Sequence, residues 1–337
     1  MKKVLFALTI FLIATSCKKS SDNSIEEPVP ESIAKMTLLP PKLSYDPTAV
    51  QGDINYNLLG YGYDVTGKID DASSARVPVI DMVSFAKEKH VEGGLAATYS
   101  MNSWDGINAE ALALQLSWGL KATEGRKLYG QSIKSFFPDE LPFAEKYIYG
   151  YYSDIIEYKQ LKFFTDKSTL KYLSTSFKSD LQTMTAETLV KKYGTHVLTN
   201  ISLGARLNIA YQGETVATDR TLVQNAGYDV ALNKFFGKFS GRINKIDSNY
   251  LRQIKAPKVA FEVVGGDPTK IKITETANGQ RVDIKDWSEA LSAKSSVFVR
   301  AIALVPLTEL IDDPARKAEL EQYIPSYLTA NEVKLSK

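Results

Sequence analysis

The feature that most limits the fold of this chain is a helix that ends at a glycine and leads directly into a long β-type segment. Thr185 is placed to cap the helix, the Lys191-Lys192 pair suits its last turn, and Gly194 suits the position after its end. The apolar residues that can share one helix face are Leu189, Val190 and Tyr193. Residues 197–210 are rich in β-branched and aliphatic residues and predict a strand. The pattern therefore predicts a helix and a strand joined by almost no loop.

Two further segments predict strands. Residues 258–264 form an apolar run closed by the turn sequence Gly265-Gly266-Asp267-Pro268, and residues 296–305 form another. Helical and strand patterns are mixed without a regular strand–helix–strand rhythm, and no repeat of about 20–50 residues is visible. We therefore expect an α+β fold in one main domain.

The first residues have the pattern of an export signal. Lys2 and Lys3 precede an apolar run of about a dozen residues, too short for the roughly 20 that a membrane helix needs, and small residues then lead to Cys17. Cys17 is the only cysteine and lies where a sequence resembling the bacterial lipobox places its acylated residue. We expect removal of residues 1–16 and lipidation of Cys17, with an ordinary signal peptide and a chance cysteine as the alternative. This predicts a lipid-anchored protein of the cell envelope, at the outer membrane or cell surface, or one released from it.

The remaining chain divides by composition. Residues 17–40 are rich in Ser, Glu, Lys and Pro and predict a flexible tether, residues 41–315 the domain, and residues 316–337 a C-terminal helical tail. Loss of residues 1–16 removes two lysines and leaves 39 basic and 39 acidic residues. A neutral chain is not expected to bind nucleic acid, or an anionic bilayer, through its net charge.

The joint between helix and strand also carries a family motif. Residues 193–205 read YGTHVLTNISLGA, which resembles the signature of the membrane-attack-complex/perforin (MACPF) family, Tyr-Gly-Thr/Ser-His, an aromatic residue, and a Gly-Gly pair about six residues later. The matching residues are Tyr193, Gly194, Thr195, His196 and Gly204. Val197 replaces the aromatic residue and Ala205 the second glycine.

Three other segments resemble the family in the same order along the chain: residues 59–64 (LGYGYD), residues 264–268 (VGGDP) followed by Trp287, and residues 305–311 (VPLTELI). The resemblance implies a MACPF/cholesterol-dependent-cytolysin-like fold, a bent four-stranded antiparallel sheet flanked by two helical clusters. In the family these clusters unravel into paired amphipathic hairpins, and rings of subunits close into a β-barrel. Closure is physically required, because the unpaired backbone N–H and C=O groups of an open sheet edge find no hydrogen-bond partner in hydrocarbon.

The motif residues have structural interpretations that do not depend on the family. Gly204, Gly265 and Gly266 suit a sharply bent sheet where backbones cross closely or φ turns positive, although ordinary turn glycines are the alternative. His196 is one of two histidines and has no matched Asp, Ser or metal-ligand spacing, so we expect a structural hydrogen bond at the strand entry. No hydrolase, metalloprotease, nucleotide-binding or redox motif is present in the sequence. We expect no enzyme activity, no cofactor and no metal.

Residues 111–120 (ALALQLSWGL) alternate strictly, with large apolar residues at the even positions Leu112, Leu114, Leu116, Trp118 and Leu120. This period of two predicts a strand, and its length suits one membrane crossing. A strand of the domain's own sheet with one buried face gives the same pattern.

Residues 213–255 contain a second candidate. One helical face would hold Leu232, Phe235, Phe236, Phe239, Ile243 and Ile246, whereas Ala226, Tyr228, Val230 and Leu232 alternate as in a strand. Gly237 and Gly241 each lower helix propensity by roughly 1 kcal/mol. A segment compatible with both conformations suits refolding, although inert amphipathic helices also contain glycine.

These patterns predict a surface-anchored or secreted protein that engages and perforates target membranes by oligomerising into a β-barrel, as an antibacterial or host-directed toxin. Its expected partners are membrane lipid, further copies of itself and a receptor on the target cell, with no nucleic acid. The alternative is a non-lytic adhesion lipoprotein that retains the fold.

Overall fold

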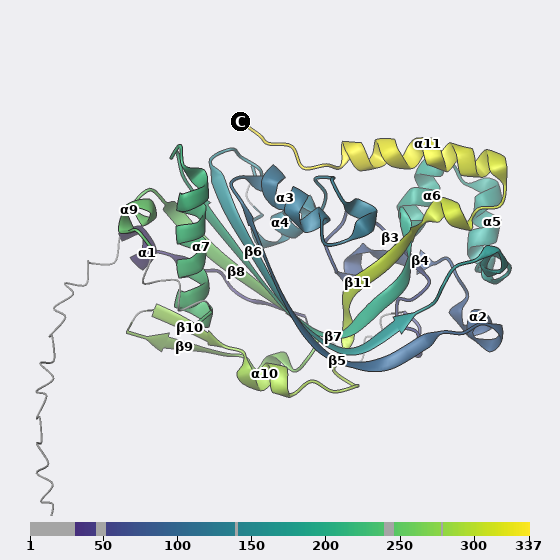
Figure 1. Cartoon of the computed structure of the whole chain (residues 1–337), viewed down its shortest axis with the longest axis horizontal. Helices are drawn as coiled ribbons and strands as arrows, with labels where there is room; N and C mark the ends of the chain where they lie inside the picture. Colours follow the sequence, from purple (N-terminus) through teal and green to yellow (C-terminus); the bar gives the residue numbers. More distant parts are fainter. Residues whose placement is uncertain (1–30, 45–51, 139–140, 239–245, 278) are drawn as a thin grey trace, which may run out of the picture.

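The computed structural model describes residues 31–44, 52–138, 141–238, 246–277 and 279–337, and a long, bent antiparallel sheet runs through it (Figure 1). The predicted export signal, Cys17, Phe239 and Ile243 lie outside these residues. None of the helices within the described ranges is both long and apolar enough to cross a membrane.

The central sheet has four positions, each antiparallel to its neighbours. They are occupied in order by β5 (Glu92–Gly106), β6 (Tyr147–Lys162), β7 (His196–Glu214) and, in the last position, β8 (Lys255–Val264) followed by β11 (Val297–Pro306). The last two strands share the outer side of β7, because Arg206 pairs with Val264 whereas Gly204 pairs with Val297. The α+β class and the bent four-stranded antiparallel sheet are confirmed.

Smaller elements accompany this sheet. Further strands include β3 (Tyr61–Tyr63), β4 (Ala75–Pro78), and the hairpin of β9 (Lys272–Thr276) and β10 (Gly279–Asp283). Helices among the described residues include α2 (Met82–Glu88), α3 (Ala109–Ser117), α4 (Gly130–Phe136), α5 (Thr175–Thr183), α6 (Ala186–Tyr193), α7 (Arg220–Phe236), α9 (Ser248–Leu251), α10 (Lys285–Glu289) and α11 (Pro314–Ala330).

The predicted joint between helix and strand is present. The Thr185 hydroxyl accepts a hydrogen bond from the Thr188 N–H (3.3 Å), and α6 ends at Gly194, whose φ of 78° favours glycine. Strand β7 begins at His196. The strand predicted at 197–210 and its pairing with the strand before Gly265 are both confirmed.

The sheet separates two hydrophobic cores, because successive strand residues point to opposite faces. Tyr149 and Tyr151 of β6 pack into the first core, with helices α3 to α6 and α11, whereas Ile148 and Tyr152 pack into the second core, with α7. The two predicted membrane segments therefore rest on opposite faces of one sheet.

Three glycines allow the sheet to bend where β7 changes partner. A Cβ on Gly204 would overlap the carbonyl oxygen of Ile156, beside a register shift between Glu157 and Lys159 of β6. Gly265 and Gly266 have φ values of 69° and 67° and end β8. These glycines fit the close approach and positive φ that the sequence predicted for them.

The flexible tether predicted over residues 17–40 is wrong for residues 31–40. This stretch forms α1 (Glu31–Ala34) and β1 (Thr37–Leu38), and β2 (Lys42–Ser44) follows it. Ile33 and Met36 are buried in the second core. The prediction rested on the polar composition and took no account of these two apolar side chains. Their burial, together with the pairing of β1 and β2 with β8, offsets the entropy cost of ordering the segment.

For residues 111–120 the alternative of a strand in the domain's own sheet is wrong, since residues 109–117 form helix α3. The membrane-crossing strand stays a prediction. The Asn108 side chain accepts from the Ala111 N–H (2.8 Å) and caps the helix. Leu112 and Leu116 are buried, and their spacing of four residues satisfies a helical face as well as a period of two.

Candidate membrane-inserting segments

Two chain segments leave the central sheet at the same end. The first segment, residues 107–146, joins β5 to β6, and the second segment, residues 215–254, joins β7 to β8; each has 40 residues. The strand ends are adjacent, because Gly106 pairs with Tyr149, Tyr147 with Glu214, and Glu214 with Lys255. In Figure 1 both segments lie toward the upper ends of β6 and β8.

Their length and position suit an extension of the sheet. One membrane crossing by a β-strand takes about 9–11 residues, so 40 residues suffice for two crossings and a turn. Each segment connects an antiparallel strand pair that is already hydrogen-bonded close to the exit point. A hairpin formed by either segment would therefore continue an existing ladder in register.

The first segment is packed into the first core. Helices α3 and α4 bury Leu112, Leu116, Ile133 and Phe136 there. Leu114 is only half-buried, and Trp118 at the helix end has a relative exposure of 60%. In the helix, therefore, Leu112 and Leu116 are buried whereas Leu114 and Trp118 are partly or largely exposed. These four side chains would lie on one face only if the segment became an extended strand.

The second segment is packed against the opposite face. Leu232, Phe235 and Phe236 of α7 are buried in the second core, and the Phe236 ring meets that of Phe261 edge-on at 5.4 Å. The predicted helical face reaches only to Phe236, because Gly237 adopts a left-handed φ of 65° and ends the helix. Its predicted continuation to Phe239 and Ile243 lies outside the described residues, and Ile246 is partly buried against the same core.

Polar contacts attach α7 to the sheet. The Gln224 side-chain amide donates to the Tyr149 carbonyl (2.8 Å), and the hydroxyls of Tyr228 and Ser103 lie 3.1 Å apart. Just after the helix, the Lys238 ammonium forms a 2.8 Å ion pair with Asp154, which is 3% exposed. These bonds must break before the second segment can extend.

Arg220, at the start of α7, holds the exits of both segments together. Its guanidinium donates to the carbonyls of Ile107 (2.8 Å), Thr215 (3.2 Å), and Glu145 and Tyr147 (both 2.8 Å). These carbonyls lie at both ends of the first segment and at the start of the second. We refer to this arrangement as the Arg220 clamp. No sequence pattern predicts it, because its acceptors are backbone carbonyls, which every residue type carries.

The family-motif residues anchor the base of the sheet instead. The Tyr193 hydroxyl donates to Asp180 (2.6 Å), and the Thr195 N–H donates to the Tyr63 carbonyl (3.0 Å). The Nδ1 of His196 lies 2.9 Å from the Thr195 hydroxyl, and burial lowers the pKa of His196 to about 4. His196 is therefore a neutral, buried side chain at the start of β7.

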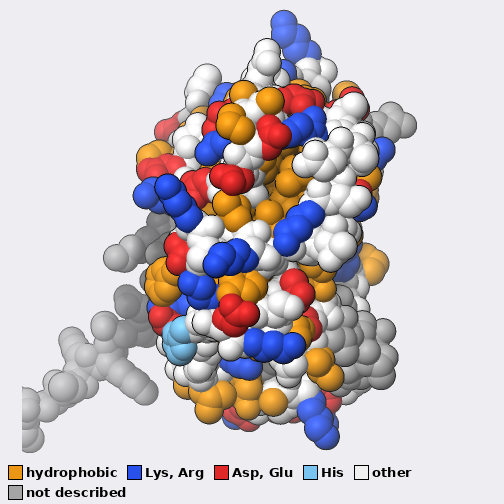
Figure 2. All heavy atoms as spheres, turned by 90° about the vertical axis from the view of Figure 1, so that its right-hand side faces the viewer, with side chains coloured by type: hydrophobic (Ala, Val, Ile, Leu, Met, Phe, Trp, Pro, Cys, Tyr) orange, Lys and Arg blue, Asp and Glu red, His pale blue; other side chains and the backbone are white. Residues whose placement is uncertain are grey.

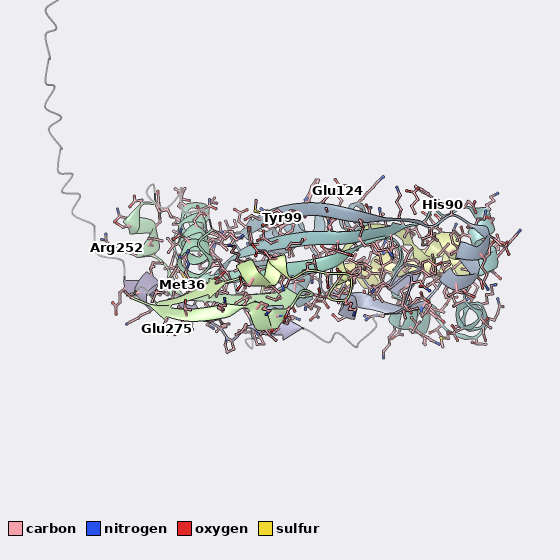
Figure 3. The ribbon with its side chains drawn as sticks, turned by 90° about the horizontal axis from the view of Figure 1, so that it is seen from below. Met36, His90, Tyr99, Glu124, Arg252 and Glu275 are labelled. Atoms are coloured by element: carbon pink, nitrogen blue, oxygen red, sulfur yellow. The ribbon has the colours of Figure 1, made fainter. Side chains whose placement is uncertain are left out.

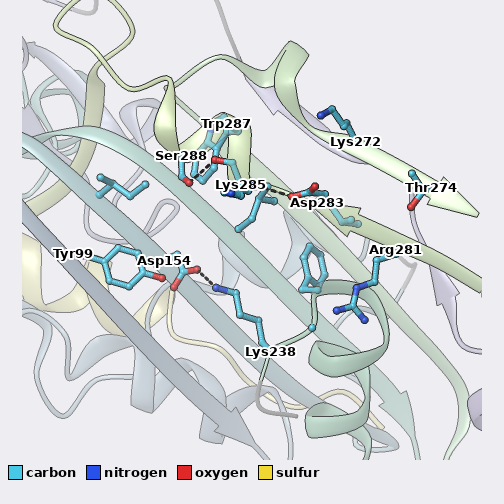
Figure 4. A pocket seen from close by; sticks show the side chains of 15 residues that line it. Tyr99, Asp154, Lys238, Lys272, Thr274, Arg281, Asp283, Lys285, Trp287 and Ser288 are labelled. Carbon is cyan, nitrogen blue, oxygen red and sulfur yellow. Dashed lines mark hydrogen bonds and ion pairs between the residues drawn. The ribbon is translucent and has the colours of Figure 1, made fainter. Parts of the chain in front are cut away.

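A cavity of about 630 Å³ lies beside the end of α7, between the sheet and the β9–β10 hairpin. Figure 4 shows Tyr99 and Asp154 on the sheet side, Lys238 below, and Arg281 near the end of the helix. Its charged side chains are of both signs, and Lys238 pairs with Asp154 across it. Within the described ranges, no three His, Cys, Asp or Glu side chains converge as metal ligands would.

The face shown in Figure 2 carries basic and acidic side chains interspersed with small apolar groups. This distribution agrees with the near-neutral overall charge of +2. This face therefore has no broad patch of positive or negative charge that could attract a charged membrane surface.

Comparisons with known proteins agree with this architecture. The MAC/Perforin domain family matches residues 141–336. The crystal structure of GNIP1Aa from Chromobacterium piscinae is similar with a TM-score of 0.63 and 17% identity, over 84% of this chain and 57% of that one. A MAC/Perforin-domain protein from Bacteroides thetaiotaomicron is similar with a TM-score of 0.64 and 18% identity, over 86% and 62%.

The chain thus spans about three fifths of the length of these two structures, and at such identities the likeness concerns the fold alone. No curated protein sequence matches the chain.

Proposed function

Because the chain belongs to the MAC/Perforin domain family, we propose that it engages target membranes and perforates them, with copies of the chain assembling side by side. The observation that supports this function best is the pair of 40-residue segments at one end of the antiparallel sheet. Both would refold into hairpins that extend the sheet into the bilayer. Its partners would be membrane lipid, further copies of itself and a receptor on the target cell.

Assembly follows from the chemistry of strand edges. In hydrocarbon every backbone N–H and C=O must be paired within the protein, so inserted hairpins require neighbours on both sides. The sheet has four positions, and therefore β5 of one copy and β8 of the next would run antiparallel when all copies face the same way. Repetition of that contact gives a ring if the rotation closes.

Refolding of the two segments would exchange burial in the protein core for burial in lipid. Leu112, Leu116 and Phe235 would leave the core and enter the bilayer. They would keep the stabilisation of about 25 cal/mol per Å² that comes from removing apolar surface from water. The polar attachments of α7, including the Arg220 clamp, have no such replacement. We propose that they hold the resting form until membrane contact.

Leakage of dye from lipid vesicles tests this function, with full-length protein carrying Cys17→Ser and with negative-stain imaging of the same vesicles. Perforation predicts leakage together with ring-shaped assemblies. Vesicle binding without leakage or rings would contradict perforation and would favour the non-lytic adhesion function.

We also propose that Cys17 carries a lipid that anchors the protein to the cell envelope. The basis is the signal-like start, the single cysteine and the polar residues after it. Labelled fatty acid should enter the wild type and a Ser16→Ala control, whereas Cys17→Ala should lose the label and leave the membrane fraction. Equal partitioning of the wild type and Cys17→Ala would refute the anchor.

A further inference from the structure

An ammonium group is held among a carboxylate and aromatic side chains just after α7. The Nζ of Lys238 lies 2.8 Å from the Asp154 carboxylate and 5.5 Å from the centre of the Tyr152 ring. The Tyr152 hydroxyl donates to the same carboxylate (2.6 Å). Partial burial and the neighbouring Asp154 carboxylate raise the pKa of Tyr99, whose hydroxyl points toward Asp154 in Figure 4. We refer to Asp154, Tyr152 and Tyr99 as the ammonium site, because a carboxylate beside aromatic rings is suited to bind ammonium ions.

The ammonium that fills this site belongs to the second segment. Lys238 lies two residues after the end of α7, and 23% of its side chain is exposed, whereas only 3% of the Asp154 side chain is exposed. A buried carboxylate needs a cation beside it, so Lys238 fills the site in the resting form. An ammonium group from outside the chain would satisfy Asp154 in the same way, and Lys238 would then turn to solvent.

The ammonium site opens into the cavity of about 630 Å³, a size common for small-molecule sites. Figure 4 shows Asp154 on one side of the cavity and Arg281 on the other. A Cβ on Gly237 would overlap the Arg281 guanidinium, so this glycine lets the guanidinium lie against the end of α7. Among the described residues, its hydrogen bond is from Nη1 to the Asn233 carbonyl (3.4 Å), and its other donors remain for a ligand. Guanidinium groups bind phosphates through such parallel donors.

Two other charged side chains that line the cavity are engaged within the chain. The Lys272 ammonium forms a 2.6 Å ion pair with Asp286. The Asp283 carboxylate accepts from the Lys285 N–H (2.9 Å). The cavity therefore offers a ligand an acceptor for a cation at the ammonium site and donors for an anion at Arg281.

The cavity is set back from the exits of the two segments. Helix α7 begins at the exits with Arg220 and reaches the cavity with Phe236, and its 17 residues span about 25 Å. Figure 3 shows Tyr99 well inward of Arg252, which lies near one end of the molecule and shortly before β8 begins. A bilayer that touches the exits therefore does not reach the cavity, and a ligand would arrive from solution.

We propose that this cavity binds a small zwitterion in which an ammonium group is joined to a phosphate, as in phosphocholine, and that the ligand's ammonium displaces Lys238 from Asp154. The phosphate would bind to Arg281. Loss of the ion pair with Lys238 would free the end of α7, so the ligand would favour extension of the second segment. This last step rests on the proposed function, whereas binding of the ligand does not.

Isothermal titration calorimetry with phosphocholine tests the site, in full-length protein carrying Cys17→Ser. Lys238→Met removes the internal competitor and should bind phosphocholine at least about tenfold more tightly than wild type. Asp154→Asn should bind it at least about tenfold more weakly. Lys192→Met, which removes an ion pair with Asp180 on the other side of the sheet, is the matched control and should bind as wild type does. Equal affinities of wild type and Lys238→Met, or no binding to Lys238→Met, would overturn the inference.

Arg281→Met tests the anionic side at an exposed residue. It should weaken the binding of phosphocholine about tenfold and leave the binding of choline, which has no phosphate, unchanged. Equal losses for the two ligands, or no loss for either, would overturn the inference. Circular dichroism checks that Asp154→Asn is folded; if it is not, Lys238→Met and Arg281→Met decide.

Vesicle leakage separates the source of the ligand and the proposed function. Free phosphocholine should increase leakage from phosphatidylglycerol vesicles, and phosphatidylcholine in the vesicles should not substitute for it. Stimulation by phosphatidylcholine without free phosphocholine would identify the lipid headgroup as the ligand of the same site. Binding by calorimetry with unchanged leakage would overturn the coupling to α7. If vesicles never leak, the proposed function fails, and calorimetry alone decides whether the site exists.

Discussion

The guanidinium of Arg220 donates to four backbone carbonyls that belong to three separate stretches of chain. A planar group with five donors can form such a set of bonds, and a lysine ammonium cannot reproduce its geometry. The exits of the first and second segments are therefore coupled through one side chain. Release of α7 would free the ends of the first segment at the same time.

Arg220→Ala should accordingly lower the free energy of unfolding by about 2–3 kcal/mol, because carbonyls that were paired with a charged donor lose their partner. Hydrogen exchange should increase near both exits, at residues 107, 145–147 and 215. Arg252→Ala, at an exposed arginine that directly follows α9 and is bonded locally to Asn249, is the control and should leave these amides unchanged. An increase confined to α7 would show that the clamp does not couple the two segments.

His196 predicts a pH dependence of stability. Burial lowers its pKa from 6.5 to about 4, so the unfolded chain binds a proton more readily than the folded one between these values. The stabilisation is complete above pH 6.5 and is lost as the pH falls toward 4, reaching roughly 2 kcal/mol of loss at pH 5.

Urea unfolding at pH 7 and pH 5 measures this loss. His196→Gln should remove that part of the decrease, whereas His90→Gln, a change at an exposed histidine, should not. Identical decreases in wild type and His196→Gln would contradict the assignment of the effect to His196.

At the scale of elements, the bend of the sheet depends on Gly204. Its missing side chain lets β7 approach the Ile156 carbonyl, and any Cβ there would overlap that oxygen. Gly204→Ala should therefore destabilise the fold by about 3 kcal/mol, the upper end of the usual cost of overpacking. Gly94→Ala on β5 is the matched control, because a Cβ there meets no atom within 4 Å. Equal melting temperatures for the two variants would refute the close-approach argument.

The elements differ in how well sequence predicts them, and the reason is physical. The capped helix ending at Gly194 and the strand after it were predictable, because the cap, the charges and the β-rich run are local signals. The period of two in residues 111–120 did not distinguish a strand from a helix, because Leu112 and Leu116, four positions apart, fit one face of either. The Asn108 cap and the Ala-Leu-rich composition favour the helix in the folded chain.

Other features could not be read from local pattern. The Arg220 clamp consists of carbonyls brought together by three chain stretches, and the order of residues 31–44 depends on the β8 edge and on a core more than 200 residues away in sequence. Both arise from tertiary contacts that override local composition.

At the scale of the whole molecule, the two segments rest on opposite faces of one sheet and leave it at one end. Extension would bring both into the plane of the sheet, where they become neighbouring hairpins. The central claim is that packed helices are converted into inserted strands, and α7 is the helix whose attachment can be fixed most directly.

A disulfide between α7 and β6 tests this claim. A Cβ on Gly150 would meet the ring of Tyr228, so Gly150→Cys with Tyr228→Cys, in full-length protein carrying Cys17→Ser, brings two thiols together in the space the ring leaves. Glu275→Cys with Gln280→Cys is the control, since these two residues face each other on the hairpin of β9 and β10. Vesicle leakage should be absent from the oxidised α7–β6 protein, return with reductant, and persist throughout in the control. Undiminished leakage from the oxidised protein, with the disulfide verified by mass, would show that the second segment does not unfold to insert.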